Sequence, residues 1–160
     1  MLNLKMIETT VKFLKLPHYV ETKDNLKYAT PDSICFDICA SIHEPLVLKP
    51  GERVGVPTGV KFIPENPIWF RINSRSGLAL KHGIIAIGGI IDTDYRGEIK
   101  VILLNTNNEI GCDYVIQPGE RIAQVELPFP YKAKFEEVSL DEFLKFETQR
   151  GEGGFGSTGK

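Results

Sequence analysis

Short hydrophobic runs alternate with polar and turn residues along the whole chain. The clearest example lies at residues 84–105, where eight residues made only of Ile, Ala and Gly lead into the polar segment 92–95. A second β-branched run follows Arg96 and Gly97. Two apolar runs around a short polar segment predict a β-hairpin arm within a buried sheet.

The tetrapeptide Pro-Gly-Glu-Arg occurs twice, at residues 50–53 and 118–121, and each copy separates two short apolar runs. Pro followed by Gly is typical of a type II turn, because Gly readily adopts the positive φ that this turn requires. We therefore predict two similar hairpins, which favours an antiparallel β architecture over alternating strands and helices. The flanking runs are residues 46–48, 54–56, 113–116 and 122–127.

Helical patterns are short. Residues 76–82 form the best candidate, with Ser76 as the N-cap and Gly83 as the C-terminal stop. A second candidate, at residues 139–146, begins with a Ser-x-x-Glu capping box. The pattern as a whole predicts an all-β barrel or jelly-roll-like domain with one or two helical turns. Further strands are expected at residues 11–16, 33–41 and 69–72.

The composition is that of an ordinary globular protein. With 160 residues, 42% of them hydrophobic and 25% charged, the chain is long enough to bury a core, and we expect one domain. A formal net charge of −2 gives no basic surface, so nucleic-acid binding is not expected. The apolar runs are too short to cross a membrane and no secretory signal is visible, which makes the cytoplasm the default location. Cys35, Cys39 and Cys112 lack metal-type spacing and fit a reducing compartment.

Three acidic residues stand next to apolar runs. Asp92 and Asp94 follow the Ile-rich run, and Asp37 lies among Ile, Cys and Phe. A carboxylate in such a place costs free energy unless it is solvated, paired or bound to a cation. Asp92 and Asp94 therefore belong either to a solvated hairpin tip or to a site, and Asp37 is either a hydrogen-bonded structural group or a functional one. Gly88 and Gly89 would let another molecule approach the backbone closely.

The last residues of the sequence have a different composition. Half of residues 150–159 are glycine, so this segment cannot form a packed element by itself. Residues 154–160 match the spacing of a Walker loop, but that interpretation fails because no Ser or Thr and no helix follow the lysine. Successive backbone N–H groups, two hydroxyl side chains and Arg150 nevertheless suit a polyphosphate. The alternative is a disordered glycine-rich terminus, although Phe155 and Arg150 are unusual in a plain linker.

Five segments together carry a family resemblance. In this order, they resemble the five motifs of the trimeric dUTP diphosphatase (dUTPase) family, and the resemblance extends from about residue 26 to the end. Each motif alone is a weak to moderate signal, because RSG or GER occurs by chance, whereas IDTDYRGE together with the C-terminal RGEGGFGSTG is highly specific. The segments are FDICA (36–40), SRSGLALKHG (74–83), GGIIDTDYRGE (88–98), PGERIAQ (118–124) and RGEGGFGSTG (150–159).

The resemblance implies a fold, an assembly and a reaction. The fold would be a distorted, jelly-roll-like β-barrel of the dUTPase-like (β-clip) type, spanning residues 1–148. A flexible glycine-rich arm, residues 149–160, would close over an active site of a neighbouring subunit in a homotrimer. The reaction would convert dUTP and water to dUMP and diphosphate, which limits uracil incorporation into DNA and supplies dUMP for dTMP synthesis.

The resemblance also assigns roles to single residues. Asp92 would orient and deprotonate the water that attacks the α-phosphorus, and Asp37 would help to hold Mg²⁺ through a metal-bound water. Tyr95 would pack under the deoxyribose, Phe155 would stack over the uracil, and the backbone near Gly89 would meet the uracil edge. The remaining substrate-binding residues, chiefly phosphate contacts, would be Arg75, Ser76, Gly77, Gln124, Arg150, Gly156, Ser157 and Thr158.

Some points stay open on the sequence. We expect Asp94 to pair with a basic group, and Arg121 is one candidate. Cys35 and Ser74 depart from the residues that many family members carry at these positions, although neither supplies the chemistry. Cys35 requires a backbone that accepts a side chain, which leaves the geometry of the first motif open. Two other functions compete with the diphosphatase: the related dCTP deaminase, and a dUTPase-like regulator that binds a protein partner and uses the nucleotide as a switch.

Overall fold

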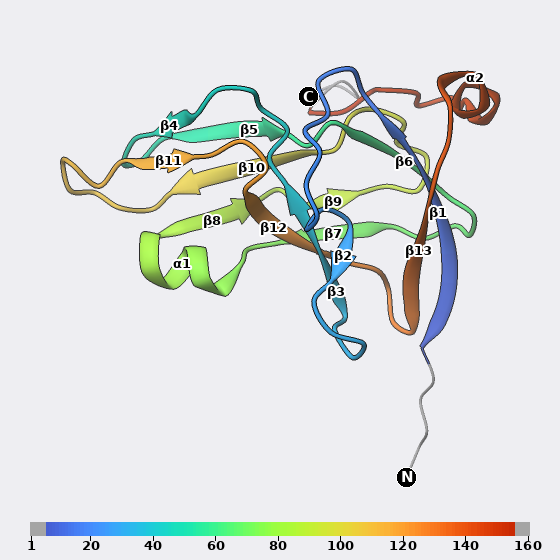
Figure 1. Ribbon diagram of the computed structural model, residues 1–160, viewed down its shortest axis with the longest axis horizontal. Helices are drawn as coiled ribbons and strands as arrows, with labels where there is room; N and C mark the ends of the chain where they lie inside the picture. The colour runs from blue at the N-terminus through green and yellow to red at the C-terminus, as the bar shows by residue number, and fades with distance from the viewer. Residues whose placement is uncertain (1–5, 156–160) are drawn as a thin grey trace, which may run out of the picture.

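The computed structural model describes residues 6–155. Among these residues, thirteen β-strands outnumber two short α-helices and one 3₁₀ turn, as expected for an all-β fold (Figure 1). The elements are β1 (Ile7–Lys15), β2 (Lys27–Tyr28), β3 (Cys35–Cys39), β4 (Leu46–Leu48), β5 (Arg53–Pro57), β6 (Val60–Pro64), β7 (Phe70–Asn73), α1 (Ser76–His82), β8 (Ile84–Ile87), β9 (Ile90–Ile91), β10 (Lys100–Asn105), β11 (Tyr114–Ile116), β12 (Arg121–Glu126), β13 (Tyr131–Glu137), α2 (Leu140–Phe143) and η1 (Leu144–Phe146).

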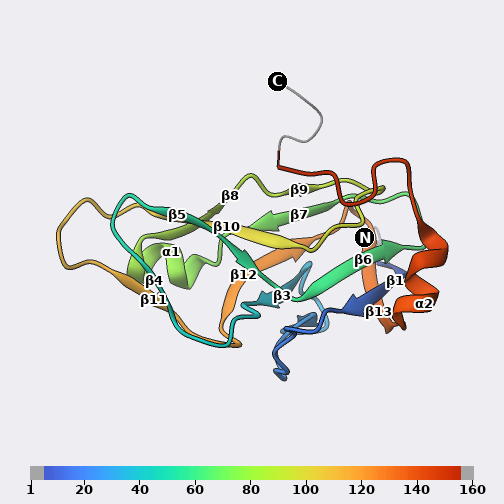
Figure 2. The same ribbon diagram turned by 90° about the horizontal axis from the view of Figure 1, so that it is seen from above.

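The strands form four small sheets around one main hydrophobic core, and a second, smaller cluster includes Phe143 of α2. Their strand orders are β13-β1-β6, β5-β10-β8, β11-β4 and β2-β3-β12-β7-β9. All pairs are antiparallel except β1 with β13, which are parallel. Helices α1 and α2 lie at opposite ends of the molecule, and the segment after α2 runs back across the top of Figure 2. None of the helices in residues 6–155 is long and apolar enough to cross a membrane.

An aromatic cluster fills the centre of the core. Phe36 and Phe70 are 0% and 1% exposed, and the rings of Phe36 and Phe135 meet edge to face with centroids 4.8 Å apart. Such geometry adds to the free energy gained from burying the rings. Because side chains alternate along a strand, burying Phe36 and Ile38 turns the intervening Asp37 toward the opposite face of β3. The core thus fixes the direction in which a candidate site residue points.

The predicted hairpin at residues 84–105 is confirmed in its pairing but not in its connection. Strands β8 and β10 pair antiparallel, with Ile102 opposite Ile87. The chain between them does not turn directly, because β9 leaves to pair with β7 in another sheet. Gly89 permits this departure: a Cβ at Gly89 would lie 2.3 Å from the carbonyl oxygen of Ile72. The polar segment is therefore part of a long loop between two sheets.

Both Pro-Gly turns are present, but the two predicted hairpins are wrong. Gly51 and Gly119 have φ of 76° and 72°, as the turns require. However, β4 pairs with β11 and β5 pairs with β10, while β12 joins β3 and β7. In each turn a glutamate side chain accepts the backbone N–H that a hairpin would pair with the opposite strand. The Lys49 N–H donates to the Glu52 carboxylate at 3.1 Å in the first turn, and the Gln117 N–H donates to Glu120 in the second. The turns therefore carry the chain from one sheet to another.

The helix predictions are confirmed in position and partly wrong in capping. Helix α1 spans the predicted residues, and Gly83 ends it in the left-handed region with φ of 65°. The N-cap is Arg75, without a side-chain capping bond, so Ser76 is the first helical residue and not the cap. At α2, Ser139 Oγ accepts the N–H of Glu142 at 3.2 Å, as predicted. The Glu142 carboxylate, which would return to Ser139 in a complete capping box, instead lies 2.8 Å from Lys12 Nζ on β1.

Candidate active site

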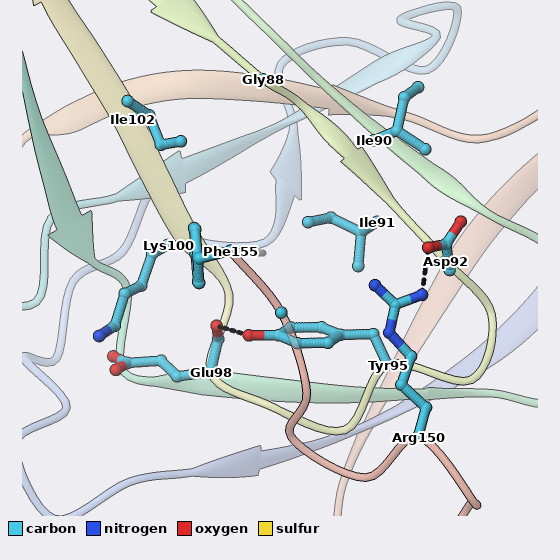
Figure 3. Close-up of a pocket in the computed structure, with 11 residues that line it drawn as sticks. Gly88, Ile90, Ile91, Asp92, Tyr95, Glu98, Lys100, Ile102, Arg150 and Phe155 are labelled. Carbon is cyan, nitrogen blue, oxygen red and sulfur yellow. Dashed lines mark hydrogen bonds and ion pairs between the residues drawn. The ribbon is translucent and has the colours of Figure 1, made fainter. Parts of the chain in front are cut away.

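A cavity of about 250 Å³ collects the residues predicted in the third and fifth motifs (Figure 3). Its walls come from the end of β8, from β9 and the loop after it, from β10, and from the segment that follows η1. The mixture of an apolar wall with a few polar groups is typical of a small-molecule site. The lining residues are Gly88, Ile90, Ile91, Asp92, Tyr95, Glu98, Lys100, Ile102, Arg150, Gly154 and Phe155.

Asp92 is placed at the rim of this cavity, directly after β9. Its side chain is 52% exposed and forms an ion pair with the guanidinium of Arg150. The same guanidinium lies 3.4 Å from Asp94 Oδ1, and these two carboxylates raise the pKa of Arg150, with Asp92 as the main cause. An exposed carboxylate at the mouth of a cavity is able to accept a proton from water. In this structure, however, the Asp92 carboxylate is ion-paired with Arg150.

Tyr95 forms the floor of the cavity and is only 8% exposed. Its hydroxyl donates to the carbonyl oxygen of Glu98 at 3.0 Å, and the Arg150 guanidinium lies 5.6 Å from the ring centroid (Figure 3). Burial raises the pKa of the Tyr95 hydroxyl, so it stays protonated and keeps this bond. Glycines surround the ring: a Cβ at Gly97 would lie 2.3 Å from the hydroxyl oxygen, and one at Gly154 would lie 2.9 Å from Cε2. The ring is thus held in one place by close backbone contact.

A second group of predicted residues gathers on the five-stranded sheet. Asp37 on β3 lies opposite Gln124 on β12, and its carboxylate is 14% exposed. Arg75 Nε and Arg121 Nη1 lie 3.3 Å from its two oxygens. Gln124 Nε2 donates to the carbonyl oxygen of Ser74 at 3.0 Å. Ser76 and Gly77 are exposed at the start of α1, and a Cβ at Gly77 would meet open space.

The expected pairing of Asp94 with a basic group is confirmed, but Arg121 is not that group. Arg121 pairs with Asp37, because the register of β12 on β3 sets Arg121 opposite Cys39, two residues from Asp37. Asp94 instead faces Arg150. Asp37 is hydrogen-bonded and paired within the chain, and its role in a site stays a prediction.

The close backbone approach expected at the glycine pair occurs at Gly89, where it involves Ile72 of the same chain. Its carbonyl oxygen accepts the N–H of Ile72 at 2.8 Å, and its Cα position leaves no room for a side chain against Ile72. Gly89 does not belong to the cavity lining, whereas Gly88 does. A contact between the Gly89 backbone and a uracil edge stays a prediction.

A sequence model of the dUTPase family matches residues 21–159. The chain belongs to the dUTPase family. It is 43% identical over 157 residues to the deoxyuridine 5'-triphosphate nucleotidohydrolase of Rickettsia felis, covering 96% of this chain and 99% of the relative. These matches favour the diphosphatase over the deaminase among the functions left open by the sequence, and they leave a regulatory role untested.

Solved dUTPases share the fold. A mutant dUTPase of Staphylococcus bacteriophage 80alpha, with dUpNHpp, superposes with a TM-score of 0.63 at 22% identity over 94% of this chain and 98% of that chain. A mutant dUTPase from phage phi11 of S. aureus, which coordinates a structural Mg(II) ion, gives a TM-score of 0.63 at 18% identity over 81% and 96% of the two chains. At these identities the likeness shows the fold alone, and it confirms the jelly-roll-like β-clip expectation.

The dUTPase motifs are not all brought together within the chain. Asp92, Tyr95, Arg150 and Phe155 share the cavity, whereas Asp37, Arg75, Ser76 and Gln124 are absent from its lining among residues 6–155. The arm residues Gly156, Ser157 and Thr158 lie outside the described residues, and their roles stay predictions.

Sequence reasoning missed the contacts that attach the segment after α2 to the loop after β9. The Arg96 backbone N–H donates to the carbonyl oxygen of Gly151 at 2.8 Å, and Arg96 Nε donates to that of Phe146 at 2.9 Å. Thr148 Oγ1 donates to the carbonyl oxygen of Asp94 at 2.6 Å. The available signal was the position of Arg96 between Tyr95 and Gly97 in the third motif. It was not decisive, because an exposed arginine in a turn is common.

Proposed function

We propose that this dUTPase uses Asp92 to orient and deprotonate the water that attacks the α-phosphorus of dUTP, giving dUMP and diphosphate. Family membership makes the chain a dUTP diphosphatase, so the proposal concerns which groups perform the reaction. The observation that supports it most is the place of Asp92, an exposed carboxylate at the rim of a cavity whose floor is Tyr95. A general base must reach its water at hydrogen-bond distance, and a rim carboxylate is accessible to one.

Arg150 would leave Asp92 when substrate binds. The guanidinium now neutralises Asp92, and a triphosphate offers it several oxygens in a fork geometry that arginine matches well. Transfer of Arg150 to the phosphates would return Asp92 to its water. The same movement would bring Phe155, which lines the cavity and is 69% exposed, over the uracil.

Tyr95 would select the sugar. Its ring is buried and contacted on its edge by Gly97 and Gly154, so it has little freedom to move away from a substrate. A ring in this position would pack under deoxyribose and leave no space for a 2′-hydroxyl. The base would be selected by backbone groups near Gly89, since cytosine has the opposite donor and acceptor pattern at two positions and each mismatched buried pair costs about 1–3 kcal/mol.

The group around Asp37 would bind the phosphate chain together with Mg²⁺. Arg75, Ser76 and Gln124 supply cationic and neutral donors beside one carboxylate. Residues 6–155 hold no group of three His, Cys, Asp or Glu side chains able to form a metal site by themselves. Asp37 is already paired with two arginines, so Mg²⁺ would be held mainly by phosphate oxygens and waters, with Asp37 bonded to one of those waters. When bound, Mg²⁺ would neutralise the charge on the phosphates.

A homotrimer with sites between subunits would unite the two groups. The proposal is supported by their separation in the chain, since no described residue around Asp37 lines the cavity at Asp92. Residues 1–148 would form the body and residues 149–160 the arm that reaches a neighbouring site. The proposed location is the cytoplasm, where the three free thiols would stay reduced and where the reaction would limit uracil in DNA and supply dUMP for dTMP synthesis.

Diphosphate release from dUTP, UTP, dCTP and dTTP, each with Mg²⁺ and with a chelator, tests this function. Metal-stimulated release from dUTP alone is the expected result, because the cavity is proposed to select both base and sugar. Equal release from UTP would refute sugar selection by Tyr95. Release that a chelator leaves unchanged would refute the role of Mg²⁺.

A further inference from the structure

Glu98 makes an unusual set of contacts for an acid at the edge of a cavity. Its side chain is 15% exposed, and Oε1 accepts the backbone N–H of Gly59 at 2.9 Å. His18 Nε2 lies within hydrogen-bond distance of the same oxygen, at 2.7 Å. Glu98 therefore joins the loop after β9 to the turn between β5 and β6 and to the segment after β1.

The turn that receives Glu98 is itself closely packed. Gly59 has φ of 69°, and a Cβ there would lie 2.6 Å from Ser41 Oγ. That hydroxyl donates to the carbonyl oxygen of His18 at 2.8 Å, so the serine that packs against Gly59 also holds the backbone of His18. Ile99, the next residue along the loop, is fastened to the same turn, where its carbonyl oxygen accepts from Thr58 Oγ1 at 2.6 Å. The Glu98 carboxylate is thus bound to a rigid support.

The position of Tyr95 depends on Glu98 directly. The Tyr95 hydroxyl has its hydrogen bond with the carbonyl oxygen of Glu98, and Figure 3 shows the ring extending from Arg150 at one end to Glu98 at the other. The backbone of Glu98 is in turn held by its own carboxylate. The Ile99 N–H of the same peptide donates to the carbonyl oxygen of Val60 at 2.9 Å, so the carboxylate adds a second tie to this region. Without that carboxylate the Gly59 N–H loses its partner, and the peptide that anchors the tyrosine hydroxyl is held less firmly.

We propose that Glu98 is a positioning residue for sugar discrimination, whose carboxylate fixes the height of the Tyr95 ring in the cavity. The inference rests on the proposed function in one respect, namely that Tyr95 faces the sugar of the nucleotide. A small displacement of a packed ring changes the space for one hydroxyl far more than it changes contacts to the base or the phosphates. Loss of the Glu98 carboxylate is therefore expected to weaken selectivity more than it weakens binding of the deoxynucleotide.

The test compares the dissociation constants of dUpNHpp and its ribonucleotide counterpart by titration calorimetry, in the full-length protein and in variants. Glu98→Ala is expected to reduce the preference for dUpNHpp about tenfold, which corresponds to about 1.4 kcal/mol of lost discrimination. Glu98→Gln keeps an acceptor for the Gly59 N–H and should restore most of the preference. The matched control is Glu52→Ala, which removes a carboxylate bond to a backbone N–H on a distant exposed turn and should leave the preference unchanged.

Each outcome bears on the proposal. An unchanged preference in folded Glu98→Ala, with only a lower unfolding temperature, would overturn it and leave Glu98 a structural residue. If Glu98→Ala fails to fold, His18→Ala removes one of the two partners and must lower the preference in the same direction, or the proposal fails. A wild-type protein that prefers dUpNHpp but does not hydrolyse dUTP would refute the proposed function and leave this inference standing. A wild-type protein without any preference would overturn the inference.

Discussion

Gly97→Ala probes the packing of Tyr95 more sharply than a change of the tyrosine itself. The new Cβ would lie 2.3 Å from the Tyr95 hydroxyl oxygen, 2.5 Å from Cζ and 2.8 Å from Cε2, all shorter than the 3.4 Å at which ordinary contact begins. The ring or the loop must therefore move by about 1 Å, the difference between 3.4 and 2.3 Å. Overpacking of this kind costs about 1–3 kcal/mol.

The displaced ring should alter substrate choice as well as stability. The overpacking cost itself lowers the free energy of unfolding. The ratio of kcat/KM for dUTP to that for UTP should fall as well, because a moved ring no longer blocks the 2′-hydroxyl, and each loss of about 1.4 kcal/mol of discrimination is a factor of ten. Steady-state kinetics with both nucleotides, together with calorimetric unfolding, measures the two effects. Gly55→Ala is the matched control, because a Cβ there meets nothing within 4 Å. A Gly97→Ala protein with the wild-type ratio would refute the claim that the Tyr95 ring excludes the 2′-hydroxyl.

Three further predictions concern the arm, the bond that breaks and a buried thiol. Deleting residues 150–160 removes Arg150 and Phe155 from the cavity. The value of kcat/KM for dUTP should fall roughly a hundredfold, with little change in unfolding temperature. Near-normal turnover would show that the arm is dispensable. Hydrolysis in water enriched in oxygen-18 should place the label in dUMP, measured by mass spectrometry, and label in diphosphate would contradict attack at the α-phosphorus. Burial raises the pKa of the Cys39 thiol to about 12 from its ordinary 9.0, so deprotonation of this thiol is less favourable in the folded than in the unfolded protein. The stability contributed by this group is complete below pH 9.0 and is lost as the pH rises from there toward about 12. Urea unfolding across that range should show a smaller decline for Cys39→Ala, and equal declines would contradict the assignment.

Local features of the fold were predictable, whereas strand partners were not. The positive φ of Gly51, Gly119 and Gly83 follows from the chemistry of a turn or helix end, and these predictions hold. The Pro-Gly turns gave no information on which strands pair, because pairing is decided by contacts far apart in the sequence. In the first turn, the Glu52 carboxylate accepts the backbone N–H of Lys49, which a hairpin would pair with the opposite strand. The flanking apolar runs therefore suggest a hairpin that does not form.

The same distinction applies to the site. Asp92, Tyr95, Arg150 and Phe155 were selected from motifs, and the structure does bring them to one cavity. The partner of Asp94 was predicted wrongly, because it depends on where the arm crosses the loop, a contact between residues more than fifty positions apart. Sequence alone also gave no indication that Glu98 reaches Gly59, since this bond requires the β5–β6 turn to lie beneath the cavity.

The central claim is that Asp92 is the general base, and the single-turnover rate of Asp92→Asn at saturating dUTP tests it most directly. Asn keeps the size of the side chain and its ability to hydrogen-bond water, but it does not take up a proton. The account predicts that the rate of dUMP formation falls by about 10²–10⁴-fold, while dUpNHpp still binds. A variant that binds the analogue and retains a rate near that of the wild type would contradict the account and place the base elsewhere.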